Sequence, residues 1–526
     1  MKKLLVLLVV LLVFTLVFAG CKSTAPATTT PPASPTTKAT SPTLTPKSGG
    51  TFQGGISEPY SLGYPGTMTG QTDGQTSSQG LETLFIFDKQ YNLVPLLATG
   101  YTTDPVGKTI TITLRKGVKF HDGTDFNATA CKWNLDEYRS GGRPELKSVA
   151  SVDVVDDYTV RINLSKFDNT IVNSLSNGAD AGRMISPAAC TKNGKAWAEK
   201  NPVGTGPYIF VSWEKDVAVK WKRNDNYWGG KPYIDAIVQN RSADATVALM
   251  DFKAGNRDVT AGVAPTDAKT LEKEGKYLMI IPPQGQVPAL AGFAGDPGSP
   301  FSKLEVRQAL SYAIDVKSLS DGFGLGYYII QNQWAVPGTW GYNTSLAGYP
   351  FSLQKAKDLL TKAGYPSGFK TTLSFYNTGQ IQVDESTAMQ SMLKAVGIEV
   401  TLNPLLRPGF ADIASNSKGF TGIVRQQGFS SPDPLLKYAG VAAGQEFTGM
   451  LVPQEFKDVY AQAVAAPDAV SKQKLVWQLE SLAVDKYCMQ TFLYMQPSPI
   501  FKNKRLHDDL YGEMPFYYMS PKAWLE

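Results

Sequence analysis

Histidine and cysteine are scarce in this chain, which has 2 His and 4 Cys among its 526 residues. So few histidines leave little for a histidine-rich metal site, and they make a Ser–His–Asp or Cys–His catalytic arrangement not credible. Apart from Cys21, the cysteines are Cys131, Cys190 and Cys488, whose odd number and wide spacing exclude a disulfide framework. A single bridge among them is possible, although buried free thiols are the default. The composition therefore predicts no metal site, no cofactor and no catalytic residues.

The main body of the chain also lacks net charge. The whole chain carries a formal net charge of +5, and the residues before Ser48 include five lysines and no acidic residue. The body from Ser48 to Glu526 is therefore neutral, so the sequence pI of about 8.7 does not indicate a basic binding face. Without such a face, nucleic acid is excluded as an electrostatic partner.

The N-terminus is typical of a secretory signal. Two lysines precede an apolar run over residues 4–13, and small residues lead into Cys21. The run is too short and wrongly flanked for a membrane span. Phe18–Cys21 resembles a bacterial lipobox, which implies removal of residues 1–20 and diacylation of Cys21. Ordinary secretion with an incidental cysteine is the alternative, and either reading places the protein outside the cytoplasm.

Residues 21–47 form a stretch rich in Ser, Thr, Pro and Ala that contains no acidic residue. Such a composition cannot bury enough apolar surface to fold. Fully extended at about 3.1 Å per residue, the stretch would reach roughly 80 Å. We therefore expect a lipidated Cys21 followed by a tether that holds the body away from a membrane surface.

The body is too long for a single hydrophobic core, so we expect two or three domains. Its first half is dominated by strand patterns. Residues 109–114 alternate between Thr and an apolar residue, as in a half-buried strand. Residues 152–164 and residues 206–221 each contain two strand-like runs around a polar turn, which predicts two hairpins.

The second half has the period of helices. Ser302 with Glu305 is typical of a capping box, and Ser352 can cap the helix that follows it. A strand near residues 371–376, a helix over residues 384–396 and an alternating run over residues 398–402 have the order of a βαβ unit. These patterns predict an α/β lobe.

Ser352 and Lys355 also fit the Ser-x-x-Lys pattern of penicillin-recognising enzymes. The pattern is short, and the role of Ser352 as a helix cap explains it better than a nucleophile does. A cell-wall hydrolase that uses these two residues is therefore kept only as a minor alternative.

Six segments of the body are specific when they are taken together and in order. They are Ser48–Thr51, Leu81–Phe85, Thr113–Gly123, Pro202–Tyr208, Arg223–Tyr233 and Val306–Asp315. With them the body resembles the family 5 extracellular solute-binding proteins of ABC transporters, the oligopeptide, dipeptide and nickel group. The resemblance extends from about Ser48 to beyond Asp433.

The resemblance implies an α/β fold of two lobes joined by two strands, the type II periplasmic-binding-protein fold, with an extra β-rich domain in the first lobe. We place the first lobe at residues 48–84, 186–285 and 491–526, the extra β-rich domain at residues 85–185, and the second lobe at residues 286–490. The lobes would close on a ligand, and the closed form would be recognised by an ABC permease and ATPase complex. We expect a monomer, lipid-anchored on either the periplasmic face or the outer surface of a cell membrane.

The resemblance also points to a ligand-binding segment, residues 427–434. In peptide-binding relatives an aspartate of this segment pairs with the free amino group of the peptide, and Ser430 takes its place here. A hydroxyl cannot hold an ammonium as a carboxylate does, and an Asp-Pro step such as Asp433-Pro434 more often makes a turn. An oligosaccharide, a modified peptide or another polar molecule therefore stays beside an ordinary peptide as a candidate ligand. A nickel ligand is disfavoured, because no histidine lies near this segment.

We predict nine ligand-binding residues from this segment, from Arg425, which flanks it and could supply hydrogen bonds, and from aromatic residues elsewhere in the second half. Aromatic side chains can line a cavity by stacking, although each could equally belong to a core. The nine are Trp334, Trp340, Arg425, Gln427, Gly428, Phe429, Ser430, Asp433 and Tyr494. A sensor or surface interaction protein on the same fold is the alternative to a transport component.

Overall fold

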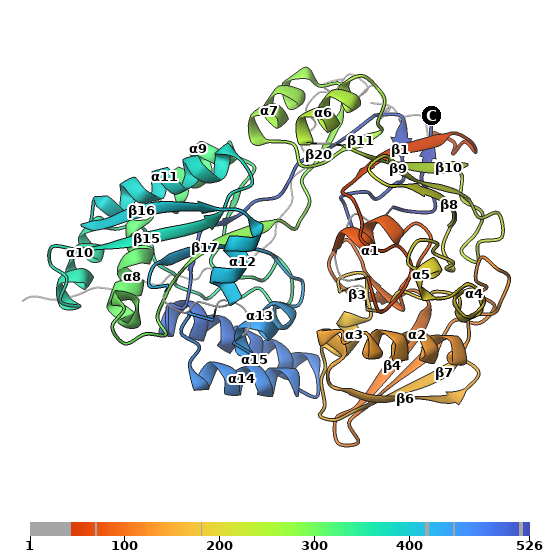
Figure 1. Cartoon of the computed structure of the whole chain (residues 1–526), viewed down its shortest axis with the longest axis horizontal. Helices are drawn as coiled ribbons and strands as arrows, with labels where there is room; N and C mark the ends of the chain where they lie inside the picture. The colour runs from red at the N-terminus through yellow and green to blue at the C-terminus, as the bar shows by residue number, and fades with distance from the viewer. Residues whose placement is uncertain are drawn as a thin grey trace, which may run out of the picture. The chain divides into compact units, whose positions relative to one another are not determined.

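The structure is a computed structural model that describes residues 44–68, 71–179, 181–242, 244–415, 420–444, 448–514 and 519–526. It divides into a short unit, Met1–Thr45, and a compact unit, Pro46–Glu526, whose elements Figure 1 shows. The predicted signal segment, Cys21 and most of the predicted tether lie outside the described residues. Within the described ranges, no helix combines the length and apolar character that crossing a membrane requires.

A four-stranded sheet forms the centre of the predicted first lobe. Its order is β1–β10–β9–β8, with β1 parallel to β10 and the other neighbours antiparallel. The strands are β1 (Thr51–Ile56), β8 (Tyr208–Glu214), β9 (Ala218–Arg223) and β10 (Ala236–Arg241). The hairpin predicted within residues 206–221 is confirmed as β8 and β9. The C-terminal strands β21 (Leu506–His507) and β22 (Trp524–Leu525) contribute Leu506 and Leu525 to the same core.

A second four-stranded sheet, antiparallel throughout, lies within residues 85–185. Its order is β4–β5–β7–β6. The strands are β4 (Ala98–Asp104), β5 (Thr109–Leu114), β6 (Val149–Asp156) and β7 (Thr159–Leu164), and helix α2 (Ala128–Ser140) packs against β6 and β7. The predicted strand over residues 109–114 is confirmed, and so is the hairpin within residues 152–164. Ile110, Ile112 and Leu114 are buried, as the alternating pattern requires.

Short elements between and after these two sheets complete residues 46–285. The strands are β2 (Phe85–Phe87), β3 (Leu93–Pro95), β11 (Val259–Thr260) and β12 (Leu278–Ile280). The helices are α1 (Gln71–Ser77), η1 (Pro144–Leu146), α3 (Ile171–Ser174), α4 (Pro187–Asn193), α5 (Lys195–Ala198), α6 (Ala245–Lys253) and α7 (Pro265–Glu274).

A five-stranded mixed sheet organises the predicted second lobe. Its order is β16–β15–β17–β13–β18, in which β15 is parallel to β16 and β17, and β13 is antiparallel to β17 and β18. The strands are β13 (Gln286–Gly292), β15 (Phe369–Tyr376), β16 (Ile398–Leu405), β17 (Ile423–Phe429) and β18 (Thr491–Phe492). Helix α11 (Gln380–Lys394) connects β15 to β16, so the predicted βαβ unit is confirmed.

Helices cover both faces of this sheet (Figure 1). One set comprises η2 (Pro300–Ser302), α8 (Leu304–Ala313), α9 (Val316–Gly324), α10 (Leu353–Lys362) and α11. The other comprises α12 (Arg407–Ser415), α13 (Pro434–Ala442), α14 (Gln454–Val464), α15 (Ala469–Ser481) and η3 (Leu482–Lys486). Successive residues of β17 face opposite cores, because Ile423 packs with the first set and Val424 packs with the second.

Two adjacent segments connect the second lobe to the first. Residues 281–285 lead from β12 to β13, and residues 496–499 lead from β19 (Tyr494–Met495) to β20 (Ile500–Lys502). Strand β20 pairs with β11 and β12, while β19 pairs with β14 (Ile329–Ile330) of the second lobe. The segments are joined where Gln286 and Gln496 exchange backbone hydrogen bonds of 3.2 and 2.7 Å.

The domain boundaries stay a prediction, and these strand pairings favour an end of the second lobe near Met495.

Two helix caps test the local patterns. Ser352 accepts a hydrogen bond from the backbone N–H of Lys355 at 3.3 Å, which confirms it as the cap of α10. The capping box at Ser302 and Glu305 is wrong, because Lys303 is the N-cap of α8 and makes no side-chain cap bond. Cys131, Cys190 and Cys488 are buried free thiols.

Candidate functional site

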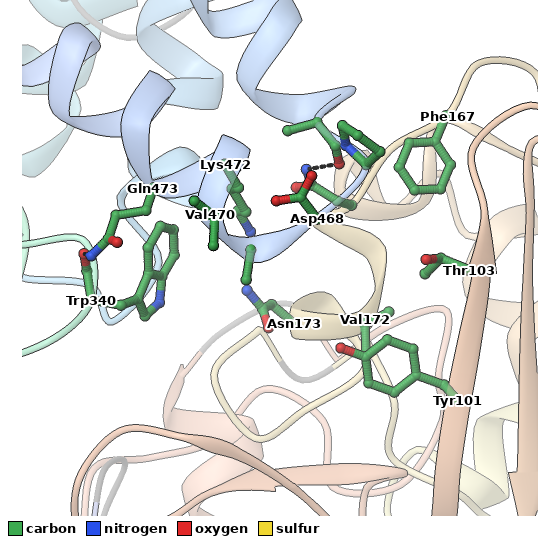
Figure 2. A pocket seen from close by; sticks show the side chains of 14 residues that line it. Tyr101, Thr103, Phe167, Val172, Asn173, Trp340, Asp468, Val470, Lys472 and Gln473 are labelled. Atoms are coloured by element: carbon green, nitrogen blue, oxygen red, sulfur yellow. Dashed lines mark hydrogen bonds between the residues drawn. The ribbon is translucent and has the colours of Figure 1, made fainter.

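A cavity of about 480 Å³ lies between the β-rich domain and the second lobe (Figure 2). One wall comes from β4, from the segment that leads into α3 and from α3 itself. The other comes from Trp340, from the turn between α14 and α15 and from the start of α15. The lining residues are Tyr101, Thr103, Phe167, Asn169, Val172, Asn173, Trp340, Ala466, Pro467, Asp468, Ala469, Val470, Lys472 and Gln473. We name this cavity the interdomain pocket.

The lining of the interdomain pocket combines aromatic rings with neutral polar groups. Tyr101, Phe167 and Trp340 supply the rings, and three of the polar side chains are amides. Asp468 and Lys472 are its charged side chains among the described residues. Apolar walls with a few polar groups that fix orientation are typical of sites for small ligands.

Local capping bonds fix the second-lobe wall. Asp468 caps α15, because its carboxylate accepts from the backbone N–H and from the hydroxyl of Ser471, both at 2.8 Å. This cap starts the helix that carries Lys472 and Gln473. Gln473 donates from Nε2 to the carbonyl oxygen of Trp340 at 2.7 Å. The helix therefore holds the loop that presents the tryptophan.

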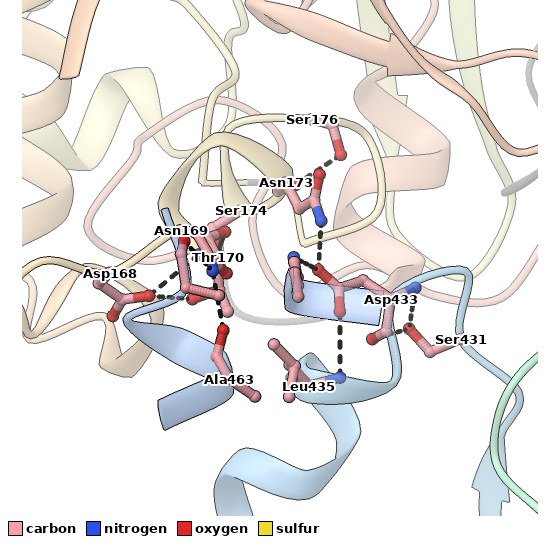
Figure 3. Close-up of polar contacts among 12 residues, drawn as sticks. Asp168, Asn169, Thr170, Asn173, Ser174, Ser176, Ser431, Asp433, Leu435 and Ala463 are labelled. Carbon is pink, nitrogen blue, oxygen red and sulfur yellow. Dashed lines mark hydrogen bonds and ion pairs between the residues drawn. The ribbon is translucent and has the colours of Figure 1, made fainter. Parts of the chain in front are cut away.

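Asn169 joins the β-rich domain to the end of α14 (Figure 3). Its backbone N–H donates to the carbonyl of Val464 at 2.9 Å, and its Nδ2 donates to the carbonyls of Ala463 at 2.8 Å and Ala466 at 3.1 Å. The last carbonyls of a helix have no partner within the helix, so they are ready acceptors. Asp168 orders the turn before α3, because its carboxylate accepts from the backbone N–H and hydroxyl of Thr170 at 3.0 and 2.6 Å.

Asp433 makes a second connection between the same two parts. Its carboxylate accepts from Nδ2 of Asn173 in α3, from Nζ of Lys472 at 2.5 Å and from the backbone N–H of Leu435 at 3.1 Å. The last of these bonds caps α13. Burial, with the nearby charges of Asp168 and Asp433, raises the pKa of Tyr460. The interdomain pocket is thus bordered by bonds that join residues far apart in the sequence.

The structure places the predicted binding residues in three groups. Trp340 lines the interdomain pocket, and Asp433 bonds to two residues that line it. Gln427 is half-buried and Gly428 is buried, while Phe429 at the end of β17 is 48% exposed.

The remaining predicted residues are buried with partners from the chain itself. Arg425 pairs with Glu385 of α11, and Tyr494 donates to the same carboxylate at 2.6 Å. The indole N–H of Trp334 donates to Oε1 of Gln490 at 3.1 Å. Ser430 lies against a connecting segment, because its hydroxyl is 3.3 Å from both the backbone nitrogen and the carbonyl oxygen of Gly285. Their roles in binding stay a prediction, and the structure does not bring these four residues to the pocket wall.

The other half of the pocket consists of residues that no sequence pattern identified. Tyr101, Asn169 and Asn173 come from the β-rich domain, and Lys472 comes from the start of α15. Neither alternation nor helical spacing marks these residues. The Asp468–Ser471 capping pattern, which predicts where α15 begins, was the available local signal.

Other chemistry has little support among the described residues. No group of three or more His, Cys, Asp or Glu residues that could hold a metal ion occurs in the ranges that the structure covers. The hydroxyl of Ser352 is used as the cap of α10, and Nζ of Lys355 lies 5.2 Å from the ring centroid of Tyr312. The pair Ser352 and Lys355 is therefore accounted for by local structure.

The model of the bacterial extracellular solute-binding proteins, family 5 Middle, matches residues 92–447. Glutathione-binding protein GsiB of Pectobacterium atrosepticum is 35% identical over 342 residues, which cover 63% of this chain and 64% of that protein. Glutathione-binding protein GsiB of Escherichia coli O6:K15:H31 is 36% identical over 330 residues, which cover 61% of this chain and 63% of that protein. The chain therefore spans less than two thirds of the length of these relatives.

Solved structures match over most of the chain. Substrate-binding protein CtaP of an ABC transporter from Listeria monocytogenes superposes with a TM-score of 0.81 at 19% identity, over 91% of this chain and 100% of that one. DppA from Helicobacter pylori, in complex with the peptide STSA, gives a TM-score of 0.74 at 22% identity, over 91% and 99%. NikA from Brucella suis, in complex with Fe(III)-EDTA, gives 0.78 at 22% identity, over 90% and 100%. At these identities the likeness establishes the two-lobed fold.

Proposed function

Because this chain belongs to the bacterial extracellular solute-binding proteins of family 5, we propose that it is the solute-capturing component of an ABC importer. The observation that carries the proposal is the interdomain pocket, whose two walls belong to different parts of a two-lobed fold. Two adjacent connecting segments join the lobes, which is the arrangement that permits hinge closure around a ligand. The closed form would then be recognised by a permease and ATPase complex in the membrane.

The solute is a peptide or another small polar molecule. Peptide-like ligands are supported by the relatives that are named for glutathione and by the neighbour that holds a peptide. Aromatic rings beside amide groups in the pocket also suit an oligosaccharide, which stacks its ring faces and hydrogen-bonds its hydroxyls. In either case the ligand is released unchanged, so the protein acts as a receptor and not as an enzyme.

The site of action is outside the cytoplasm, with a lipid on Cys21 as the anchor. The lipobox-like Phe18–Cys21 and the Ser/Thr/Pro-rich residues that follow it support this assignment. Metabolic labelling with a palmitate analogue tests it, and Cys21→Ala should abolish the labelling and release the protein from the membrane fraction.

A thermal-shift screen tests the proposed function directly. Purified protein lacking residues 1–47 is heated with glutathione, with di- to hexapeptides and with oligosaccharides, each over a concentration series. A ligand that binds the folded state at about 100 times its Kd adds roughly 2.7 kcal/mol to stability, so the melting temperature should rise and saturate. Failure of all three classes at millimolar concentration would contradict the proposal for these solutes.

Measurement of solute uptake distinguishes a transport component from a sensor. Deletion of the gene should abolish accumulation of the labelled solute that the screen identifies, and expression of the full chain should restore it. Binding without any change in uptake would favour a sensor or a surface interaction protein.

A further inference from the structure

Lys472 occupies a position in the pocket wall that is built like a site for an organic ammonium ion. Its Nζ is 2.5 Å from a carboxylate oxygen of Asp433 and lies 5.1 Å from the ring centroid of Trp340. A carboxylate on one side and an aromatic face on another are the two groups that bind alkylammonium ions best. In this protein the side-chain ammonium of Lys472 occupies that position.

The carboxylate of Asp433 has no exposed surface left for a ligand. Its side chain is 0% exposed, whereas that of Lys472 is 12% exposed. One oxygen accepts from the backbone N–H of Leu435, and the other accepts from Lys472 and from Asn173 (Figure 3). An amino group of a ligand could reach this carboxylate only by displacing one of these three donors, and Lys472, the charged donor, is anchored beside the carboxylate because it belongs to the same chain.

The rest of the pocket offers no substitute for this carboxylate. Asp468 is the other acidic residue of the lining, and its carboxylate is used by the backbone N–H and hydroxyl of Ser471. Asn169, Asn173 and Gln473 supply neutral amides, Thr103 supplies a hydroxyl, and the remaining uncharged wall is aromatic or aliphatic. A positive charge on a ligand would therefore lose its hydration in this pocket without gaining a free counter-charge.

From these contacts we infer that Lys472 determines specificity. Its own ammonium occupies the place beside Asp433 and Trp340 where the ammonium of a ligand would bind, so the interdomain pocket selects solutes that lack a cationic group. This inference rests on the proposed function, because it concerns the solute that the pocket takes up. It names the class as neutral or amine-blocked polar molecules, such as an N-blocked peptide or an oligosaccharide. Glutathione, which carries a free ammonium, should bind more weakly than its N-acetyl derivative.

Chemical rescue tests the ammonium position without knowledge of the solute. Lys472→Ala removes three methylene groups and the ammonium, which n-propylammonium replaces atom for atom. Melting temperatures are measured for Lys472→Ala, for wild type and for Lys474→Ala, whose lysine is exposed on the same helix. Each protein is heated with n-propylammonium chloride, with n-propanol, or with sodium chloride at equal ionic strength.

We expect Lys472→Ala to melt below wild type and n-propylammonium to raise its melting temperature in a saturable manner. Neither n-propanol nor sodium chloride should do so, and neither wild type nor Lys474→Ala should respond to the amine. Equal rescue by n-propanol, or no rescue at all, would overturn the inference. If Lys472→Ala does not fold, the double variant with Asp433→Asn must fold, since it leaves no buried unpaired carboxylate; its failure would count against the inference as well.

A pair of ligands tests selectivity in the same proteins. Alanyl-phenylalanine amide and its N-acetyl form differ in one charged group, and wild type should prefer the N-acetyl form by at least about tenfold. Lys472→Ala should reduce or invert that preference. Preference of wild type for the free amine would overturn the inference. If neither peptide binds, the peptide class of the proposed function fails, and the rescue experiment still decides the role of Lys472.

Discussion

Glu385 and Asp433 are two fully buried carboxylates that differ in the origin of their partners. Glu385 accepts from Arg425, from Tyr494 at 2.6 Å and from Nε2 of Gln496 at 3.1 Å. These partners lie on β17, on β19 and at the start of a connecting segment. Asp433 accepts from Lys472 of its own lobe and from Asn173, which lies 260 positions earlier in the sequence. The first carboxylate holds one lobe together, and the second joins two parts of the molecule.

The predicted binding residues divide between these two carboxylates. Arg425 and Tyr494 belong to the centre at Glu385, where Arg425 matches the charge and Tyr494 donates a hydrogen bond. Asp433 and Trp340 belong to the pocket wall, where bonds cross from one part of the fold to another. Residues of the second kind are the ones whose contacts change if the lobes move apart, so they are the better candidates for control of binding.

The largest effect should follow from breaking the centre at Glu385. Arg425→Met leaves a buried carboxylate without its cation, and loss of one partner of such a pair costs about 3–5 kcal/mol. Urea unfolding should show this loss, and the double variant with Glu385→Leu should recover most of it because no charge remains buried. Arg425 does not line the interdomain pocket, so solute binding in that pocket by the folded fraction should not change, and a loss of binding would support its predicted role as a ligand-binding residue. A loss below about 1 kcal/mol would show that Arg425 is not bound as the structure has it.

A smaller effect should follow from breaking the bonds that cross between the parts. The double variant Asn169→Ala with Asn173→Ala removes three side-chain hydrogen bonds between the β-rich domain and the second lobe. We expect a loss of about 2 kcal/mol, one of the three bonds being to a charged group. Small-angle scattering of the unliganded protein should show a larger radius of gyration as the parts separate.

Asn163→Ala is the matched control for these two substitutions. Asn163 donates to Ser151 and Asp153 at 2.8 and 2.7 Å, and all three residues lie on strands of one sheet. This variant should leave the radius of gyration unchanged. If the control and the double variant scatter alike, the asparagine bonds do not hold the parts together.

The sequence predicted the regular elements well because their signals are local. The alternation of residues 109–114 and the strand–helix–strand order after Thr371 depend on side chains within one element, and the structure confirms both. The predicted capping box at Ser302 does not form, because the hydroxyl of Ser302 is bound in the turn that precedes the helix. Ser299 accepts from the backbone N–H of Phe301 at 3.3 Å, and the hydroxyl of Ser302 donates to the carbonyl of Ser299 at 2.7 Å. With Ser302 bound in this turn, the helix begins one residue later.

The pocket could not be predicted in the same way because it is assembled from distant segments. Arg425 was a reasonable candidate beside Gln427, but strand alternation turns it toward α11 and the carboxylate of Glu385. Asn169 lies in a turn, and Asn173 lies in a four-residue helix. In neither place does the surrounding sequence indicate which group the side-chain amide will bind. Trp340 was placed among the binding residues from its ring alone, which could not distinguish it from the buried Trp334.

Glu480 is a third buried carboxylate, and among the described residues no cation pairs with it. Its described partner is the hydroxyl of Tyr438 at 2.6 Å, and its Oε1 has no hydrogen-bond partner. Burial raises the pKa of Glu480 to about 8 from an ordinary value of 4.5. The folded protein therefore keeps a proton that the unfolded chain loses, and stability falls as the pH rises through this range.

From pH 7 to pH 8 the contribution of this group is isolated by comparison with Glu480→Gln, because burial also raises the pKa values of Cys131, Cys190 and Cys488. Burial also raises the pKa of Glu82, to about 7, and lowers that of His121 to about 4, so both act mainly below this window. Across it wild type should lose about 1 kcal/mol more unfolding free energy than Glu480→Gln, which keeps an acceptor for Tyr438. Parallel curves for the two proteins would show that the carboxyl of Glu480 does not stay protonated in the folded state.

The smallest effect on stability should come from Trp340, at the wall of the interdomain pocket. Trp340→Ala removes a ring that lines the pocket and lies beside Lys472, so the unfolding free energy should fall by less than about 1 kcal/mol. Isothermal titration with the solute that the thermal screen identifies should nevertheless show at least about tenfold weaker binding, because a large aromatic contact is lost. Trp477→Ala is the control, since this tryptophan is 38% exposed on α15 and does not line the pocket. Equal weakening by both substitutions would mean that the solute does not contact Trp340, and the binding site would have to be sought away from the interdomain pocket.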